Sequence, residues 1–124
     1  MKKENTAPAN TDAFDVAVAE SDIQMVEASS SDIYTHKFKK PISYNGKTYE
    51  SLTFDFSSLT GGDSLDVENE LQTQGHAVVV RTLDGAYLSR MCARACTEPV
   101  GFDIFRVMSV KDYAIITNKS KRFF

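Results

Sequence analysis

The chain has little of what several classes of protein depend on. Its 124 residues include no tryptophan, three prolines, two histidines and two cysteines. Two cysteines do not make a disulfide framework, and no apolar run approaches the roughly 18 residues of a membrane-spanning helix. The basic pair Lys2-Lys3 is not followed by an apolar core of about 7–15 residues, so we expect no signal peptide. These absences predict a soluble protein that stays in a reducing cytoplasm.

Residues that could carry chemistry are scarce and poorly spaced for it. Cys92 and Cys96 lie four apart on a predicted helix. That places their Cβ atoms about 5–6 Å apart, beyond the roughly 3.5–4.5 Å of a disulfide. With His36 or His76 they form part of a zinc set, but no second pair of Cys or His completes four ligands. Small residues packed in a helix seam are the simpler interpretation, so we expect no metal or cofactor.

Other motifs are also incomplete. Gly61-Gly62 lacks the Lys-Ser/Thr of a phosphate-binding loop, and the acids that follow it do not match a Ca²⁺ loop. Lysines make residues 37–47 basic, but no nucleic-acid recognition motif accompanies them. A catalytic Cys–His pair needs a base beside an exposed thiolate, which the predicted core positions do not offer. We therefore predict a protein that is not an enzyme and binds neither nucleic acid nor membrane.

Charge divides the chain into two parts. Residues 1–33 hold seven Asp and Glu against two Lys, a net charge of −5, whereas residues 34–124 hold ten acids against twelve Lys and Arg, a net of +2. The first part is rich in Ala, Ser and acids, which is typical of disorder. We predict a disordered acidic tail over 1–33 and one folded domain over 34–124. The few apolar residues of the tail leave open a short helix formed on a partner.

A β-hairpin is the clearest element in the sequence. Residues 34–38 and 52–56 alternate apolar and polar, and Asn45-Gly46 between them is a strong turn signal. A two-residue turn would place Phe38 opposite Thr53 and mix the two faces. We therefore predict a three-residue loop, with Gly46 in the left-handed region and a bulge. The predicted pairs are Phe38 with Leu52, His36 with Phe54, Tyr34 with Phe56 and Lys40 with Glu50.

Helices must cover the apolar face of this hairpin. We predict them over Asp63–Gln74, Gly85–Thr97 with Asp84 as N-cap, a short turn or helix near Phe102–Arg106, and a last helix opened by Ser109-Val-Lys-Asp112. Residues 76–81 are extended in character, and the pattern leaves open a third strand or a buried connection. The fold class is thus α+β: an N-terminal β-hairpin followed by three to four short helices.

The helices also show which sides face the core. The predicted core stripe of the middle helix is Leu88, Met91, Cys92 and Ala95, with Arg90 and Arg94 turned away. In the first helix, Val67 and Leu71 give a stripe that looks too narrow to be fully buried. The predicted inner side of the last helix is Val110, Tyr113, Thr117, Ser120 and Phe124.

An ordered set of three segments resembles a known family. The segments are Phe38-Lys-Lys-Pro41-Ile42-Ser-Tyr44-Asn-Gly46-Lys47-Thr-Tyr49-Glu50-Ser-Leu52, then Tyr87 to Thr97 with its Ala and Arg residues, and last Val110-Lys111-Asp112-Tyr113 through Phe124. Together they resemble the tail assembly chaperones of tailed phages and prophages. The likeness covers about residues 34–124, and residues 1–33 have no counterpart in it.

The resemblance implies a function without catalysis. Such chaperones bind the long, helical, apolar tape-measure protein in the infected cell and are absent from the finished virion. Many also exist in a frameshift-extended form that recruits the tail-tube protein, and some association between copies is compatible with this role. Two alternatives stay open: a structural tail or head-tail connector component of the virion, and a small host adaptor protein.

Candidate partner-binding residues follow from exposure, because the family has no residue motif that can be carried over. Apolar residues beside charges are typical of binding patches. The candidates are Val67, Leu71, Arg90, Arg94, Phe123 and Phe124.

Overall fold

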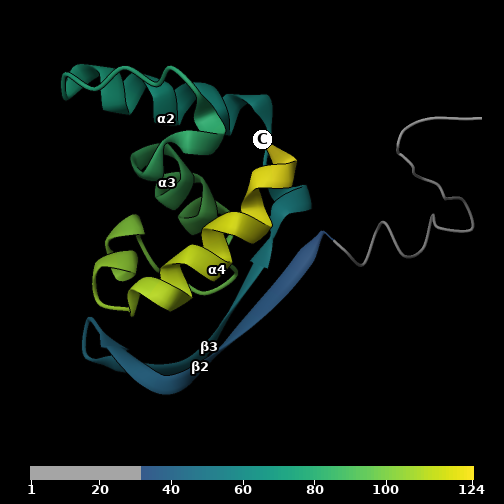
Figure 1. The fold of residues 1–124 in the computed structure, drawn as a ribbon, viewed down its shortest axis with the longest axis vertical. Coiled ribbons are helices and arrows are strands. Elements are labelled where there is room, and N and C mark those ends of the chain that lie inside the picture. The colour runs from purple at the N-terminus through teal and green to yellow at the C-terminus, as the bar shows by residue number, and fades with distance from the viewer. Residues whose placement is uncertain (1–31) are drawn as a thin grey trace, which may run out of the picture. The chain divides into compact units, whose positions relative to one another are not determined.

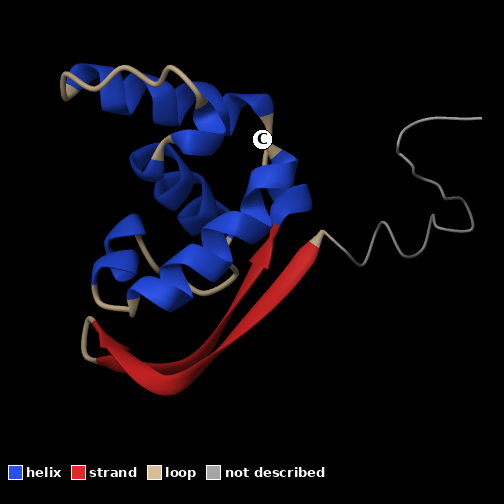
Figure 2. Cartoon of the chain, in the orientation of Figure 1, coloured by secondary structure: helices blue, strands red, loops and turns tan. Residues whose placement is uncertain are grey.

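A β-hairpin and three α-helices make up the part of the chain that the structure describes, residues 32–124 of a computed structural model (Figure 1). The strands are β2 (Ile33–Tyr44) and β3 (Lys47–Asp55), and the helices are α2 (Gly61–Thr73), α3 (Gly85–Ala95) and α4 (Val110–Ser120). Short 3₁₀ turns occupy Phe56–Ser58, Arg81–Leu83, Phe102–Arg106 and Lys121–Phe123 (Figure 2). The predicted α+β class is confirmed. The tail predicted over residues 1–33 lies, but for its last two residues, outside the described part.

The hairpin turn differs from the predicted one. Tyr44 pairs with Lys47, so Asn45 and Gly46 form a two-residue turn, with φ of 48° and 77°. Two positive φ angles are what a tight hairpin turn of this hand requires, and Asn-Gly is the sequence that best adopts them. The predicted three-residue loop is therefore wrong.

The pairing beyond the turn also differs, for a reason visible in β2. His36 lies opposite Leu52 and Tyr34 opposite Phe54, and the register shifts between Lys37 and Ile42. Pro41 lies in that shift, where its missing N–H cannot join the ladder. The predicted Lys40–Glu50 pair falls in the same irregular stretch and does not form. The predicted partners of Leu52 and Phe54 are off by two residues, an even number, so the apolar residues still share one face.

The helices cover that face of the hairpin, as Figure 1 shows. Phe38, Leu52, Phe54 and Phe56 are buried in a cluster that also contains residues from α3, α4 and the turn at 102–106. A second, smaller cluster lies between α2 and α3 and comprises Val67, Leu71, Tyr87, Leu88 and Met91. The two clusters meet along α3, whose predicted core stripe is buried as expected.

Each helix begins at a recognisable cap. Thr60 accepts a hydrogen bond from the N–H of Asp63 while Asp63 accepts one from the N–H of Thr60, so α2 begins two residues before the predicted start. Gly75 follows the helix at φ 81°. The caps predicted at Asp84 and Ser109 are confirmed. The middle helix ends at Ala95 because Cys96 turns to pair with Phe54 of β3.

The structure contradicts two predictions of burial, one for the last helix and one for the segment after α2. Val110, the first residue of α4, is exposed, whereas Ile116 of the same helix is buried. Residues 76–80 form neither a strand nor a buried connection, since only Val78 is even half-buried. The apolar side of α2 is covered by α3 together with Leu59, Val78 and Phe124, whereas Val79 and Val80 stay exposed.

Replacing Gly46 by valine is expected to destabilise the hairpin by about 1–3 kcal/mol, because a β-branched residue is strained at positive φ. The measurement is the free energy of unfolding from urea titration. Gly61→Ala is the control, since Gly61 has no positive φ and nothing lies within 4 Å of an added Cβ. A Gly46→Val variant as stable as the parent would contradict the turn.

Candidate functional site

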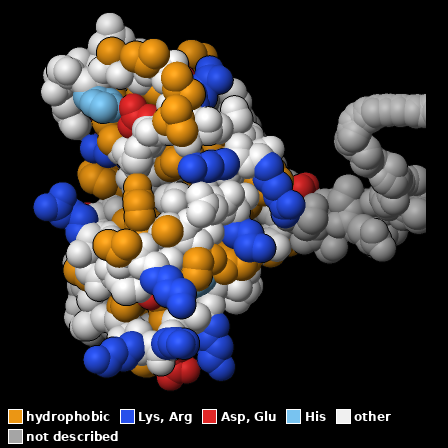
Figure 3. Space-filling model, in the orientation of Figure 1, with side chains coloured by type: hydrophobic (Ala, Val, Ile, Leu, Met, Phe, Trp, Pro, Cys, Tyr) orange, Lys and Arg blue, Asp and Glu red, His pale blue; other side chains and the backbone are white. Residues whose placement is uncertain are grey.

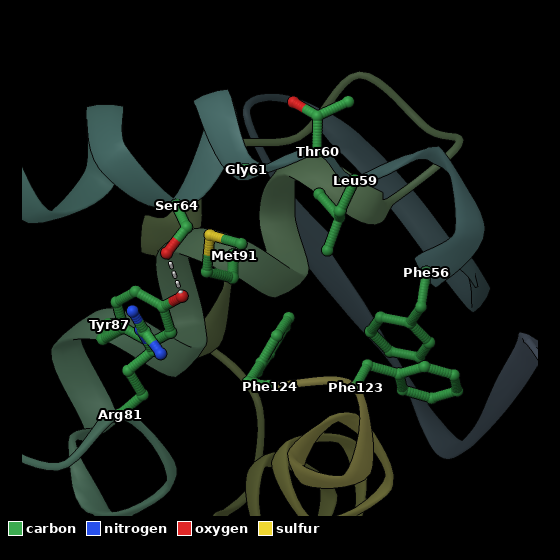
Figure 4. Close-up of a pocket in the computed structure, with 10 residues that line it drawn as sticks. All are labelled: Phe56, Leu59, Thr60, Gly61, Ser64, Arg81, Tyr87, Met91, Phe123 and Phe124. Carbon is green, nitrogen blue, oxygen red and sulfur yellow. Dashed lines mark hydrogen bonds between the residues drawn. The ribbon is translucent and has the colours of Figure 1, made fainter.

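The end of the chain lines a hollow of about 390 Å³ (Figure 4). Its walls come from the segment between β3 and α2, from the first turn of α2, from α3 and from the C-terminal residues. The lining residues are Phe56, Leu59, Thr60, Gly61, Ser64, Arg81, Tyr87, Met91, Phe123 and Phe124. Most of them are apolar or aromatic, so the hollow offers contact area rather than reactive groups.

Aromatic stacking fixes the two terminal phenylalanines. Phe123 stacks on Phe56 with ring centroids 4.7 Å apart, and Phe124 meets the edge of Tyr87 at 5.7 Å. Figure 4 shows the ring of Phe124 reaching into the hollow, toward Met91 and Tyr87. The Tyr87 hydroxyl is hydrogen-bonded to Ser64 at 2.7 Å, so this polar atom is satisfied. These contacts give the hollow a preformed aromatic wall.

A second hollow of about 450 Å³ adjoins the first and shares Arg81 and Phe124 with it. It is lined by the loop after α2, in which Val79 is 88% exposed. Figure 3 shows hydrophobic side chains gathered over this loop, at the top of the view. Arg81 and Glu68 form an ion pair at its rim, with 2.9 Å between Nε and Oε2. We call the lining of both hollows the Phe124 surface.

The predicted partner-binding residues differ in exposure, and only some of them lie on a surface that a partner could reach. Phe123 and Phe124 are half-buried and line the first hollow, as expected for a partly exposed pair. Val67 and Leu71 are buried against Tyr87, Leu88 and Met91 and have no free surface, so their placement on a binding patch is wrong. The narrow stripe is sufficient for burial because the large side chains of Tyr87, Leu88 and Met91 of α3 cover both residues.

Of the two arginines of α3 predicted to face solvent, Arg94 is exposed and Arg90 is not. The side chain of Arg90 is only 11% exposed: it donates to Glu70 and to the carbonyl of Ala86, and it stacks on Phe102 at 3.9 Å. Arg94 donates to Asp63 at 2.9 Å. Both guanidinium groups therefore hold α3 to its neighbours, and neither is free for a partner.

The described residues offer no reactive thiol. Burial raises the pKa of Cys92 to about 12 and that of Cys96 to about 12, so both thiols are neutral at physiological pH. Cys92 is fully buried beside Ser120. Within residues 32–124, no group of three or more His, Cys, Asp and Glu side chains is placed to hold a metal ion.

A hydrogen-bonded set ties the hairpin to α4. Nε2 of His36 lies 2.8 Å from Oδ1 of Asp112, and Nδ1 lies 2.8 Å from the Tyr34 hydroxyl. His36 is buried between them, packed against Phe38. Both ring nitrogens are satisfied by these partners, which makes the histidine a structural link rather than a free base.

A third hollow, of about 590 Å³, lies on the other side of α3. It shares no residue with the Phe124 surface, and its wall includes the exposed side chains of Phe102 and Val110. Sequence patterns did not point to this hollow or to the exposed valine loop. The one available signal was that residues 77–80 are apolar without the alternation of a strand.

In the part of the chain that the structure describes, no helix has the length and apolar character needed to cross a membrane. Comparisons with protein-family models, with curated proteins and with solved structures found no match.

Proposed function

We propose that this chain is a tail assembly chaperone of a tailed phage or prophage. In this proposal it binds the tape-measure protein in the cytoplasm of the bacterial host, keeps it soluble, and is absent from the finished virion. Recruitment of the tail-tube protein through a frameshift-extended form would be a further part of the same role. The observation that carries the proposal is the Phe124 surface, a pair of adjoining hollows with an aromatic wall and exposed valines, on a domain with no reactive centre among its described residues.

The shape and chemistry of this surface suit an amphipathic helix. Helices bind other proteins by placing one apolar side in a preformed hydrophobic hollow. Here the aromatic wall of Phe124 and Tyr87 is fixed by stacking, and the loop valines beside it project into solvent. Exposed apolar groups with a charged rim, such as the Arg81–Glu68 pair, are typical of interaction sites.

Repeated binding sites along the tape-measure protein would explain how a small domain keeps a very long protein soluble. A tape-measure protein offers many amphipathic turns, each of which has an apolar side to cover. Each copy covers one such side with a single hollow, so covering the rod takes several copies. A complex with several chaperones per tape-measure chain is therefore expected.

Co-expression with the tape-measure protein encoded beside this chain's gene is expected to move that protein into the soluble fraction, with both proteins eluting together. Val79→Asp should lower the soluble yield by about tenfold, because a carboxylate placed on the Phe124 surface must be desolvated on binding. Val107→Asp is the matched control, since Val107 is 51% exposed and lies outside the lining of all three hollows. Thermal melting of both variants tests that the domain stays folded.

A tape-measure protein that is soluble when expressed alone would contradict the chaperone proposal. Equal losses from Val79→Asp and Val107→Asp would move the binding site away from the Phe124 surface. Mass spectrometry of purified virions separates the main alternative, because a structural tail or connector component would be found in the particle.

A further inference from the structure

We propose that the third hollow, on the side of α3 away from the Phe124 surface, binds an acidic amphipathic segment of another protein. Such a segment presents an apolar side chain together with a carboxylate about one helical turn away. This inference goes beyond the chaperone proposal and does not depend on it. It makes the domain bivalent, with one docking site on each side of α3.

The floor of the hollow is apolar and partly open. Phe105 and Met108 are nearly buried beneath it, whereas Phe102 and Val110 at its edge are exposed. A volume of about 590 Å³ is within the usual range of a pocket that accepts a large side chain or a small ligand. The hollow therefore provides a place for an apolar anchor, such as leucine or phenylalanine.

One wall is held rigidly by Arg90. Its guanidinium lies 3.9 Å from the ring centroid of Phe102 and donates to Glu70 and to the carbonyl of Ala86. Cation–π stacking of this kind fixes the aromatic ring and its exposed edge. The wall is thus formed before any ligand arrives, which lowers the entropic cost of binding.

The charge of the hollow selects the ligand. Its lining contains two arginines and no aspartate or glutamate. Arg90 is already paired with Glu70, whereas Arg106 is exposed and has no carboxylate within 4.0 Å among residues 32–124. A free guanidinium at the rim of an apolar pocket recognises a carboxylate, because the planar group donates two parallel hydrogen bonds to it.

An acidic apolar segment fits these features better than a nucleic acid or a phosphate does. Phosphate binding draws on several cations and little apolar surface. Here aromatic and aliphatic side chains form much of the lining, and Arg106 is the single unpaired cation in it. A neutral apolar helix would fill the floor but leave Arg106 without a partner.

The test uses two labelled helical peptides that differ at one position. Each carries leucines along one side, and one has Glu a turn away from the central Leu where the other has Gln. Binding to the full chain is followed by fluorescence anisotropy and by amide shifts in NMR spectra. The Glu peptide is expected to bind several-fold more tightly and to shift the amides that line the third hollow.

Variants of the chain locate the contact. Arg106→Glu should lower the affinity of the chain for the Glu peptide by about tenfold, since the substitution replaces an electrostatic attraction by a repulsion. A peptide with Lys in place of Glu should recover binding to that variant. The matched control is Lys111→Glu, an equal charge change at an exposed residue of α4 that lies outside the lining.

Several outcomes would overturn the proposal. Equal affinities for the Glu and Gln peptides would show that Arg106 does not recognise the carboxylate. Amide shifts confined to the Phe124 surface would show that the third hollow does not bind the peptide. Sedimentation in which the parent is a dimer and Val110→Asp a monomer assigns this hollow to a second copy of the chain instead. Tighter binding of a short single-stranded RNA than of the Glu peptide assigns it to nucleic acid.

Discussion

Leu71→Asp is expected to unfold most of the domain at room temperature. Leu71 is 2% exposed and lies in the cluster with Val67, Tyr87, Leu88 and Met91. Loss of a buried leucine costs about 2–5 kcal/mol, and an unpaired carboxylate in the same place adds a desolvation cost. The sum, about 4–6 kcal/mol or more, is comparable to the whole stability of a small domain. Far-UV circular dichroism during urea titration measures it.

Leu65→Asp makes the same chemical change on the same helix and is the matched control. Leu65 is 63% exposed, so its replacement should change the free energy of unfolding by less than about 0.5 kcal/mol. Equal effects of the two substitutions would show that α2 does not pack on α3 as described. Leu71→Asp also cannot serve as a probe of partner binding, because loss of folding would mimic loss of the site.

The comparison of Leu71 with Val79 shows what a sequence pattern can tell about exposure. The spacing of Val67 and Leu71 correctly gives the inner side of α2, but their small number suggested incomplete burial. Whether two residues are enough depends on the partner element, here the bulky Tyr87 and Met91 of α3, which are distant in sequence. The valines at 79 and 80 look like core residues and are exposed for the same reason, since no element remains to cover them.

Local signals predicted the elements better than their pairing. The caps at Asp84 and Ser109 and the stop at Gly75 depend on hydrogen bonds or φ angles within a few residues, and all three are present. The hairpin register depends on Pro41, whose effect on the ladder lies several residues from the turn. A register predicted from face alternation alone cannot detect an even slip, because the faces stay the same.

The binding surfaces were the least predictable feature. Phe123 and Phe124 were identified from their terminal position, but the residues that complete their hollow come from three other segments of the chain. Arg90 and Arg94 lie on the side of α3 away from the core stripe, yet Glu70 and Asp63 of α2 reach them. Only the packing of α2 on α3 brings these acids close, and a helical pattern in one segment carries no information on it.

Asp112→Ala is expected to have the next largest effect, a loss of about 2–4 kcal/mol of stability at neutral pH. The Asp112 carboxylate accepts from His36 and from Ser109, both at 2.8 Å, near the N-terminus of α4. Hydrogen bonds to a charged group contribute about 1.5–3 kcal/mol, and an acid in the first helical turn adds about 0.3–1 kcal/mol. The variant also leaves the buried His36 without its acceptor. Asp66→Ala is the control, because Asp66 is an exposed helical carboxylate.

The pH dependence separates this explanation from simple loss of packing. Burial raises the pKa of Asp112, but hydrogen bonds from His36 and Ser109 and the charge of Lys111 outweigh it, so the pKa in the folded state is lower than usual. A lowered pKa means that the unfolded chain takes up the proton first. The stabilisation is therefore complete above the ordinary Asp pKa of about 4 and is lost as pH falls through the folded value. The difference in unfolding free energy between parent and Asp112→Ala should shrink as the pH falls below about 4. A difference that persists unchanged in acid would assign the effect to packing of the side chain instead of to its charge.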